Sequence, residues 1–336
     1  MQDFILALNK GYGINITALK PRGPVWKVVA SQGAFCLKRT KQDHSHLLWL
    51  AKTIDDLITA GFDGLLPLLL TVQGSPYWKY NNQLFILTRW LEGEKPNFTS
   101  FKQRQTFAQL YAKLHCTSAM LSMESGPSRP DWSVEYQKRA AFLKSLKLVI
   151  PNQKKLNRTD RTILSWLDYF GTQAEFAIHG LFMNQFDFWN NQPTAGGFCH
   201  NDPAPANIII ERSWFLIDYE LSKNDLFIRE LATLLLRMLR MNRWNHRIFE
   251  ELCEGYQRER NMSEEELRFL PYLLAFPHGF WRICSQRFEE NLPWSERKFA
   301  SRIWELVALE KERSSFLREI IPDFREEAHY IQGANA

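Results

Sequence analysis

Hydrophobic residues near the start of the chain alternate with polar ones in short runs, the pattern of half-buried β-strands. Turn residues such as Gly23, Pro24 and Gly33 separate the first runs, so neighbouring strands are joined by tight connections. We therefore expect an antiparallel sheet at the front of the chain. Its predicted strands span residues 16–19, 25–30, 34–38, 65–72 and 84–87.

Apolar residues with helical spacing occupy most of the remaining chain. A short helix precedes the first strand, an amphipathic helix spans residues 45–60, and helical spacing dominates after about Trp90. We expect a sheet-rich domain of residues 1–90 and a mainly helical domain of residues 91–336. The predicted helices of the second domain span residues 101–117, 132–149, 159–179, 228–241 and 246–333.

A β-hairpin pattern interrupts this helical part. Ile208–Ile210 and Trp214–Ile217 are apolar, and a polar break of three residues separates them. Asn207 begins the first of these strands and Asp218 follows the second. If the two strands pair, the side chains of Asn207 and Asp218 can converge at the open end of the hairpin.

An amide oxygen and a carboxylate that converge in this way suit Mg²⁺, which prefers oxygen ligands and keeps other positions for water and phosphate. Asp202 lies just upstream, where it could accept a proton from a hydroxyl. Such a division of work is typical of phosphoryl transfer, with the nucleotide bound elsewhere. The alternative interpretation is a surface hairpin with ordinary loop carboxylates.

The residues HNDPAPAN, followed by FLIDYE, resemble the catalytic and metal-binding loops of the aminoglycoside phosphotransferase and choline kinase superfamily. Within it, the chain looks most like the bacterial spore coat CotS family. The resemblance implies an α+β, protein-kinase-like bilobal fold. Residues 1–90 would form a small nucleotide-binding lobe with an antiparallel sheet, and residues 91–336 a larger helical lobe for catalysis and acceptor binding.

By the same resemblance, ATP would be the phosphoryl donor and Mg²⁺ its cofactor. Asp202 would orient or deprotonate the acceptor hydroxyl, and His200 would brace the catalytic loop by hydrogen bonds. Asn207 and Asp218 would hold Mg²⁺. Glu220 corresponds to a residue that could reach a second metal ion through water.

Lys38, at the end of a predicted strand, matches the lysine that holds the α- and β-phosphates of ATP in this superfamily. A glutamate of the following helix normally orients that lysine. The helix at residues 45–60 has no glutamate. We expect Asp55 to replace it, which is a departure from the family pattern.

Two further segments are implied to contact the nucleotide. The turn with Arg22 and Gly23 lies where the fold would cover the phosphates, although it lacks a G-x-G-x-x-G pattern. Arg89 and Trp90 fall in the segment that resembles the hinge, whose backbone would bind adenine. Glu230 replaces the aspartate that starts the helix behind the metal loop.

Composition excludes several other classes of protein. No apolar run reaches the roughly 18 residues of a membrane span. The N-terminus lacks a secretory signal, so we expect cytoplasmic synthesis. Five cysteines without a C-x-x-C pair indicate reduced thiols and neither a disulfide framework nor a zinc site. A net charge of +5, without a basic tail or an RNA-binding motif, does not predict a nucleic-acid partner.

Two functions remain open. In the first, the protein transfers phosphate from ATP to a hydroxyl of a small molecule or a glycan in association with the spore coat. In the second, it is a catalytically weak or inactive kinase-fold component of the coat, in contact with other coat proteins. The set of Asp202, Asn207 and Asp218 favours the first function. The missing helix glutamate, the atypical phosphate loop and two loop prolines, Pro203 and Pro205, favour the second.

Overall fold

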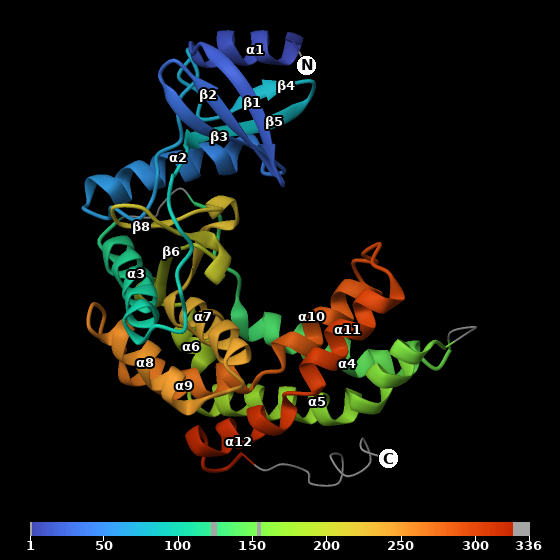
Figure 1. Ribbon diagram of the computed structural model, residues 1–336. Coiled ribbons are helices and arrows are strands. Elements are labelled where there is room, and N and C mark those ends of the chain that lie inside the picture. The colour runs from blue at the N-terminus through green and yellow to red at the C-terminus, as the bar shows by residue number, and fades with distance from the viewer. Residues whose placement is uncertain (1, 122–125, 153–155, 325–336) are drawn as a thin grey trace. The chain divides into compact units, whose positions relative to one another are not determined.

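The computed structural model describes residues 2–121, 126–152 and 156–324 (Figure 1). These residues form two compact units, each assembled from several segments of the chain. The first unit contains the segments up to Arg129, from Gly196 to Glu230 and from Gly255 to Arg260, and the second contains the others. The predicted lobe boundary near Trp90 stays a prediction, because these units are groupings by contact and not cuts at one position.

A five-stranded antiparallel sheet dominates the front of the first unit. Its order is β1-β2-β3-β5-β4. Helix α1 (Gln2–Tyr12) lies along the sheet (Figure 1), and Phe4 of α1 packs edge-on against the rings of Trp78, Tyr80 and Phe85. The strands are β1 (Ile16–Arg22), β2 (Val25–Ala30), β3 (Gly33–Thr40), β4 (Trp78–Tyr80) and β5 (Gln83–Arg89).

The strand predicted at residues 65–72 is wrong. The backbone N–H groups of Leu69, Thr71 and Val72 donate to three unrelated segments, so no ladder forms, and Pro67 has no N–H to contribute. The fifth strand is instead β4, which lies between the predicted strands at residues 65–72 and 84–87. β4 turns into β5 through Asn81 and Asn82, whose φ angles of 46° and 59° are those of a tight two-residue hairpin turn.

Helix α2 (His44–Thr59) confirms the predicted amphipathic helix. Its N-terminus is capped by Asp43, whose side chain accepts a hydrogen bond of 2.8 Å from the N–H of His46. The apolar stripe is fully buried at Leu47, Leu50, Ile54 and Leu57. This packing fixes which face of α2 is turned to solvent, and that face carries both aspartates.

Two small antiparallel sheets carry the loops of interest. The predicted hairpin is confirmed as β7 (Ile208–Ile210) and β8 (Trp214–Leu216). Strands β6 (Gly196–Cys199) and β9 (Lys223–Leu226) pair beside it, and β6 packs on α3 (Phe101–Ala119), where the N–H of Phe198 donates to Ser118 Oγ at 2.6 Å. Two loops therefore lie next to each other. One joins β6 to β7, and the other joins β8 to β9.

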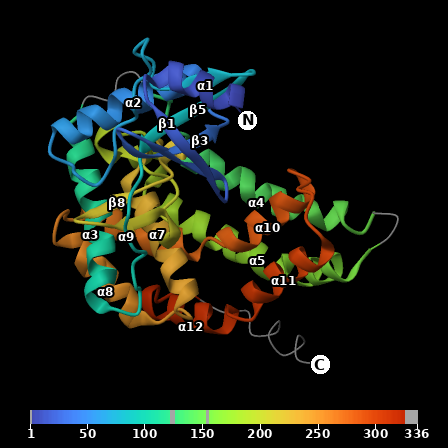
Figure 2. The same cartoon turned by 45° about the horizontal axis from the view of Figure 1, so that its top comes forward.

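The second unit is helical within the described residues. Figure 2 shows α4, α5, α10 and α11 side by side, as their contacts require. Helices α7 (Phe227–Met241) and α8 (His246–Gln257) contribute to both units. The other helices are α4 (Trp132–Val149), α5 (Arg158–Met183), α6 (Phe186–Asn190), α9 (Glu264–Ala275), α10 (His278–Phe288), α11 (Glu296–Val307) and α12 (Glu310–Ile320).

The α+β fold class is thus as predicted, and the helical run expected from residue 246 is a series of separate helices, with residues 325–333 outside the described part. Across the described residues, no helix is long and apolar enough to cross a membrane. Aromatic packing forms much of the second core: Phe170 stacks on Phe280 with ring centroids 4.3 Å apart.

Replacing Phe170 with alanine tests this core. Phe170 is 1% exposed, so we expect Phe170→Ala to lower the free energy of unfolding by about 3–5 kcal/mol in urea titrations followed by circular dichroism. Phe182→Ala is the matched control, because Phe182 lies on the same helix but is 62% exposed. Equal losses in the two variants would contradict the packing described.

Candidate active site

A cavity of about 410 Å³ lies within the first unit, in the size range of small-molecule sites. Its walls include apolar side chains of Val25, Leu66, Ile86 and Ile209. Seven of the eleven candidate residues line it: Arg22, Lys38, Arg89, Trp90, Asn207, Asp218 and Glu220.

The other four candidates have different positions. Gly23 forms the tight β1–β2 turn, where its φ of 61° favours glycine, and its neighbours Arg22 and Pro24 face the cavity. His200 and Asp202 belong to the loop between β6 and β7, which also carries Asn207. Asp55 lies on the exposed side of α2.

Asp202 and Asn207 are joined directly. The side-chain amide nitrogen of Asn207 donates to Asp202 Oδ2 at 2.7 Å and to the Asp202 carbonyl at 3.1 Å. Because the nitrogen of the amide is used in this way, its oxygen is the atom left to face a cation. The N–H of Ile217 donates to the Asn207 carbonyl at 2.9 Å, which brings Asp218 next to this loop.

The His200 ring joins the loop before β7 to the loop before β9. Its ring is fully buried. Nε2 lies 2.9 Å from the Ile217 carbonyl, and Nδ1 lies 3.3 Å from the N–H of Asp202. The tautomer that satisfies both contacts carries its proton on Nε2 and accepts at Nδ1. These bonds agree with the predicted bracing role of His200, since both of its nitrogens are used in positioning the loops.

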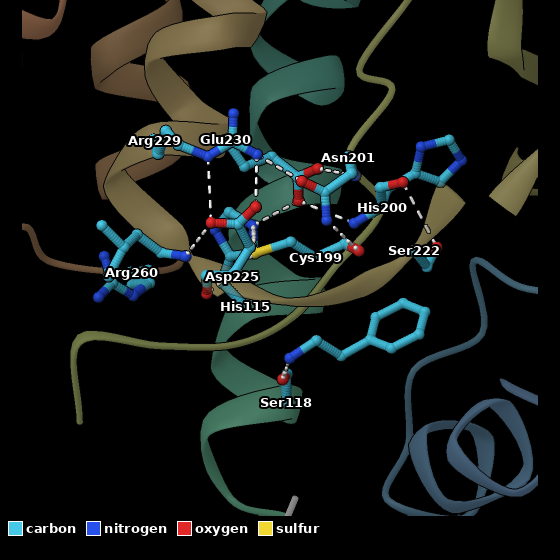
Figure 3. Close-up of polar contacts among 12 residues, drawn as sticks. His115, Ser118, Cys199, His200, Asn201, Ser222, Asp225, Arg229, Glu230 and Arg260 are labelled. Carbon is cyan, nitrogen blue, oxygen red and sulfur yellow. Dashed lines mark hydrogen bonds and ion pairs between the residues drawn. The ribbon is translucent and has the colours of Figure 1, made fainter. Parts of the chain in front are cut away.

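A buried carboxylate anchors the same loop (Figure 3). Glu230, at the start of α7, accepts hydrogen bonds from the N–H of Asn201 at 2.5 Å and from the N–H of His200 at 3.1 Å. His115 of α3 lies 2.9 Å from Glu230 through Nε2 and 2.7 Å from the Tyr256 hydroxyl through Nδ1. Glu230 was predicted only to start the helix; its contacts make it the anchor of the loop.

Arg229 adds a second anchor. Its guanidinium binds the Asn201 side-chain oxygen and both carboxylate oxygens of Asp225, at 3.0 and 2.5 Å for the latter. Burial alone would raise the pKa of Asp225, but the positive charge of Arg229 brings the pKa below its usual value. Asn201 itself has a φ of 62°, a left-handed conformation that these bonds hold in place.

His115, Cys199 and Glu230 also place three potential metal-ligand atoms within 4.8 Å of one another. Each is already engaged in the hydrogen-bond network: the Cys199 thiol donates to the Asp225 carbonyl at 3.5 Å, and Glu230 serves the loop. Burial raises the pKa of Cys199 well above its ordinary value, which disfavours the thiolate that a metal requires. The cluster is therefore interpreted as structural support.

The expected pairing of Lys38 with Asp55 is wrong. The Lys38 ammonium contacts the carboxylates of Asp218 and Glu220. Asp55 follows Ile54 on α2, and because Ile54 points into the core, a helical step of about 100° turns Asp55 toward solvent. The helix instead contacts this region through His46, whose Nε2 lies 2.9 Å from the Glu220 carbonyl.

Arg89 has a structural partner that the sequence did not reveal. Its guanidinium donates to both oxygens of Glu211, at 2.9 and 3.2 Å, and Glu211 also accepts from the N–H of Glu92 at 2.9 Å. The Glu92 N–H and the Arg89 charge lower the pKa of Glu211. The sequence showed Glu211 only as part of a polar break. In the structure, its bonds to Arg89 and Glu92 connect the predicted hinge to the hairpin.

More bonds join the hinge segment to the hairpin. Glu94 and Ile210 exchange two backbone hydrogen bonds of 2.9 and 2.8 Å, and Lys95 Nζ donates to the Ala206 carbonyl at 2.6 Å. Lys95 lines the cavity, and burial lowers the pKa of its ammonium. Because Asn207 follows Ala206, the hinge segment and the candidate metal ligands are fixed to one another.

The donor atoms fit a hard cation. Asn207 and Asp218 line one cavity, and the amide and carboxylate oxygens of such side chains are ligands that Mg²⁺ takes up. Cys36 also lines the cavity, but burial raises the pKa of its thiol to about 11, so it is neutral near pH 7 and a poor ligand.

Comparison with known proteins identifies the family. A family model described as "Spore coat putative kinase YutH" matches residues 6–320. The chain belongs to this spore coat family. The predicted spore coat localisation is confirmed at the level of the family.

One curated relative is similar to part of this spore coat family member. The chain is 26% identical over 164 residues to spore coat protein S of Bacillus subtilis (strain 168), which covers 48% of this chain and 47% of that protein. The match thus spans about half the length of the curated relative.

Solved structures show the fold. An aminoglycoside phosphotransferase from Alicyclobacillus acidocaldarius is similar with a TM-score of 0.80 and 20% identity, over 94% of this chain and 95% of that one. A spectinomycin phosphotransferase in complex with ADP and spectinomycin is similar with a TM-score of 0.64 and 15% identity, over 92% and 98%. The predicted protein-kinase-like fold of the spore coat family member is confirmed.

Glu230→Gln tests the loop anchor. A glutamine offers one acceptor oxygen where the carboxylate offers two, so at least one of the three N–H donors loses its partner. We expect the free energy of unfolding, measured by urea titration, to fall by about 1–3 kcal/mol. Asp56→Asn is the control, because Asp56 makes only an exposed ion pair with Lys52 on α2, and we expect a change below about 0.5 kcal/mol. An unchanged Glu230→Gln protein would contradict the anchoring role.

Proposed function

We propose that this spore coat family member is an ATP- and Mg²⁺-dependent phosphotransferase that acts on a hydroxyl of a small molecule or a glycan. The observation that carries the proposal is the junction of the two loops: Asn207 donates to Asp202, and Ile217, next to Asp218, donates to Asn207. The carboxyl groups of Asp202 and Asp218 and the amide of Asn207 are thereby brought together beside a cavity of about 410 Å³.

The cavity has the features that a nucleotide needs. Apolar walls from Val25, Ile86 and Ile209 suit a flat base. Leu91, in the hinge segment, lines the cavity, and its backbone N–H makes no hydrogen bond within the part of the chain that the structure describes. We assign this N–H to the adenine edge, and the cations Arg22 and Lys38 to the phosphates.

Asn207 and Asp218 would hold Mg²⁺. When bound, the cation neutralises phosphate charge and aligns the γ-phosphate for in-line attack. Asp202 then accepts the proton of the acceptor hydroxyl, while the Asn207 amide and the His200 ring keep its carboxylate and backbone in place. The chain's own residues thus contribute positioning and a proton acceptor, which is what this reaction requires.

The acceptor is proposed only as a hydroxyl-bearing class. Spectinomycin is bound by the ADP-containing relative of known structure, and at 15% identity that likeness concerns the fold. Membership of a spore coat family supports the proposal of a coat-associated acceptor, such as a glycan. Other coat proteins are its proposed partners.

The alternative is a kinase-fold component of the coat that does not turn over substrate. It is supported by the absence of an acid on the inner face of α2 and by the contact of Lys38 with Asp218, a carboxylate that the reaction assigns to the metal. In that case the cavity would bind nucleotide weakly or not at all.

A thermal-shift titration distinguishes the two functions. Mg·ATP at a hundredfold excess over its Kd stabilises the native state by about 2.7 kcal/mol, so we expect a clear rise in the melting temperature of the wild type. The rise should be lost in Asp218→Asn and with EDTA. Asp202→Asn should keep the rise in melting temperature, since Asp202 is assigned to the acceptor hydroxyl and not to the nucleotide. The same variant should form no ADP when an acceptor is added.

Asp56→Asn is the control, because its exposed side chain lies on the outer face of α2. No shift in the wild type at millimolar Mg·ATP would support the structural alternative, and an equal shift in Asp218→Asn would remove the metal assignment.

A further inference from the structure

Lys38 contacts two carboxylates that have different surroundings. The side chain of Asp218 is 44% exposed and that of Glu220 is 10% exposed. Because the Asp218 carboxylate is partly exposed, it can give up the Lys38 ammonium and bind a metal ion without a change in the surrounding packing. The enclosed carboxylate is better placed to keep Lys38 when a nucleotide arrives, since its contact with the ammonium is less screened by water.

Helix α2 has no acidic side chain on its buried face that could contact Lys38 in place of Glu220. Its buried face consists of Leu47, Leu50, Ile54 and Leu57 with Trp49, Ala51 and Thr53. Its acids, Asp55 and Asp56, are on the other side, and Asp56 pairs with Lys52 at 2.9 Å. Within the described residues, the carboxylates in contact with Lys38 therefore both come from the loop before β9.

The backbone around Glu220 is fixed from several directions. His46 bonds the Glu220 carbonyl at 2.9 Å, the Tyr219 hydroxyl donates to the Leu66 carbonyl at 2.9 Å, and the N–H of Ser222 closes the turn onto Tyr219 at 3.0 Å. A side chain on such a restrained turn loses little entropy when it orients a lysine.

We propose that Glu220 is the residue that positions Lys38 for the nucleotide phosphates, in place of the acid missing from α2. The inference rests on the proposed function. The lysine-positioning acid and the candidate metal ligand Asp218 then lie two residues apart on one loop. Alignment of Lys38 consequently depends on the loop that binds the metal, and not on the position of a separate helix.

This role differs from the metal contact through water that the family resemblance suggests for Glu220. A positioning residue acts only through Lys38, so its removal has no effect once Lys38 is gone. A metal ligand acts whether or not Lys38 is present, and its removal changes how many cations bind. The two roles therefore give opposite results in a double-mutant cycle.

The experiment measures the affinity for Mg·ADP by calorimetry in the wild type, Lys38→Met, Glu220→Gln and the double variant. We expect each single variant to bind about tenfold more weakly and the double variant no more weakly than Lys38→Met. Manganese binding followed by electron paramagnetic resonance should give the same number of Mn²⁺ ions in wild type and Glu220→Gln. Asp55→Asn should bind Mg·ADP within about twofold of the wild type.

Several results would overturn the proposal. Losses that multiply to about a hundredfold in the double variant show that Glu220 acts independently of Lys38. One Mn²⁺ fewer in Glu220→Gln assigns it to the metal, and a tenfold loss in Asp55→Asn returns the role to α2. Glu220→Asp keeps the charge and should bind Mg·ADP better than Glu220→Gln, which controls for misfolding of the glutamine variant. Equal binding by these two variants would also contradict the proposal. A wild type that binds no Mg·ADP refutes the proposed function, and the positioning role with it.

Discussion

The hydrogen bonds that join the loop before β7 to the loop before β9 are the constraint on which the rest of the site depends. The buried His200 ring connects the Asp202 backbone to Ile217, and the Asn207 carbonyl accepts from the same residue. Beneath them, Glu230 accepts three hydrogen bonds, which offset the cost of burying its charge. The left-handed Asn201 is held by this support, through its backbone N–H to Glu230 and its side chain to Arg229.

Much of this arrangement could be predicted from the sequence, because it is local. The hairpin of β7 and β8 follows from two apolar runs around a polar break, and pairing these strands brings Asn207 near Asp218. The strand predicted at residues 65–72 was wrong because an apolar run with Pro67 satisfies its backbone through scattered bonds. The two-asparagine turn at Asn81 was the signal for the true fifth strand.

Contacts between distant segments could not be predicted in this way. Asp55 is an acid near the expected place, but the side of α2 that faces inward is decided by tertiary packing, and that packing turned Asp55 outward. Likewise, the sequence does not indicate that Glu211 pairs with Arg89 or that Glu220 pairs with Lys38. Their contacts become visible only in the folded chain, where the segment of Arg89, strand β3 and the hairpin lie together.

The central claim is that Asn207 and Asp218 bind one Mg²⁺ together with a nucleotide in the cavity. A crystal structure of the protein with Mg²⁺ and a nonhydrolysable ATP analogue tests it most directly. The account predicts Mg²⁺ about 2.1 Å from the Asn207 side-chain oxygen and from an Asp218 oxygen, with the base against Leu91. A nucleotide bound elsewhere, or a cation that does not touch these two side chains, would contradict it.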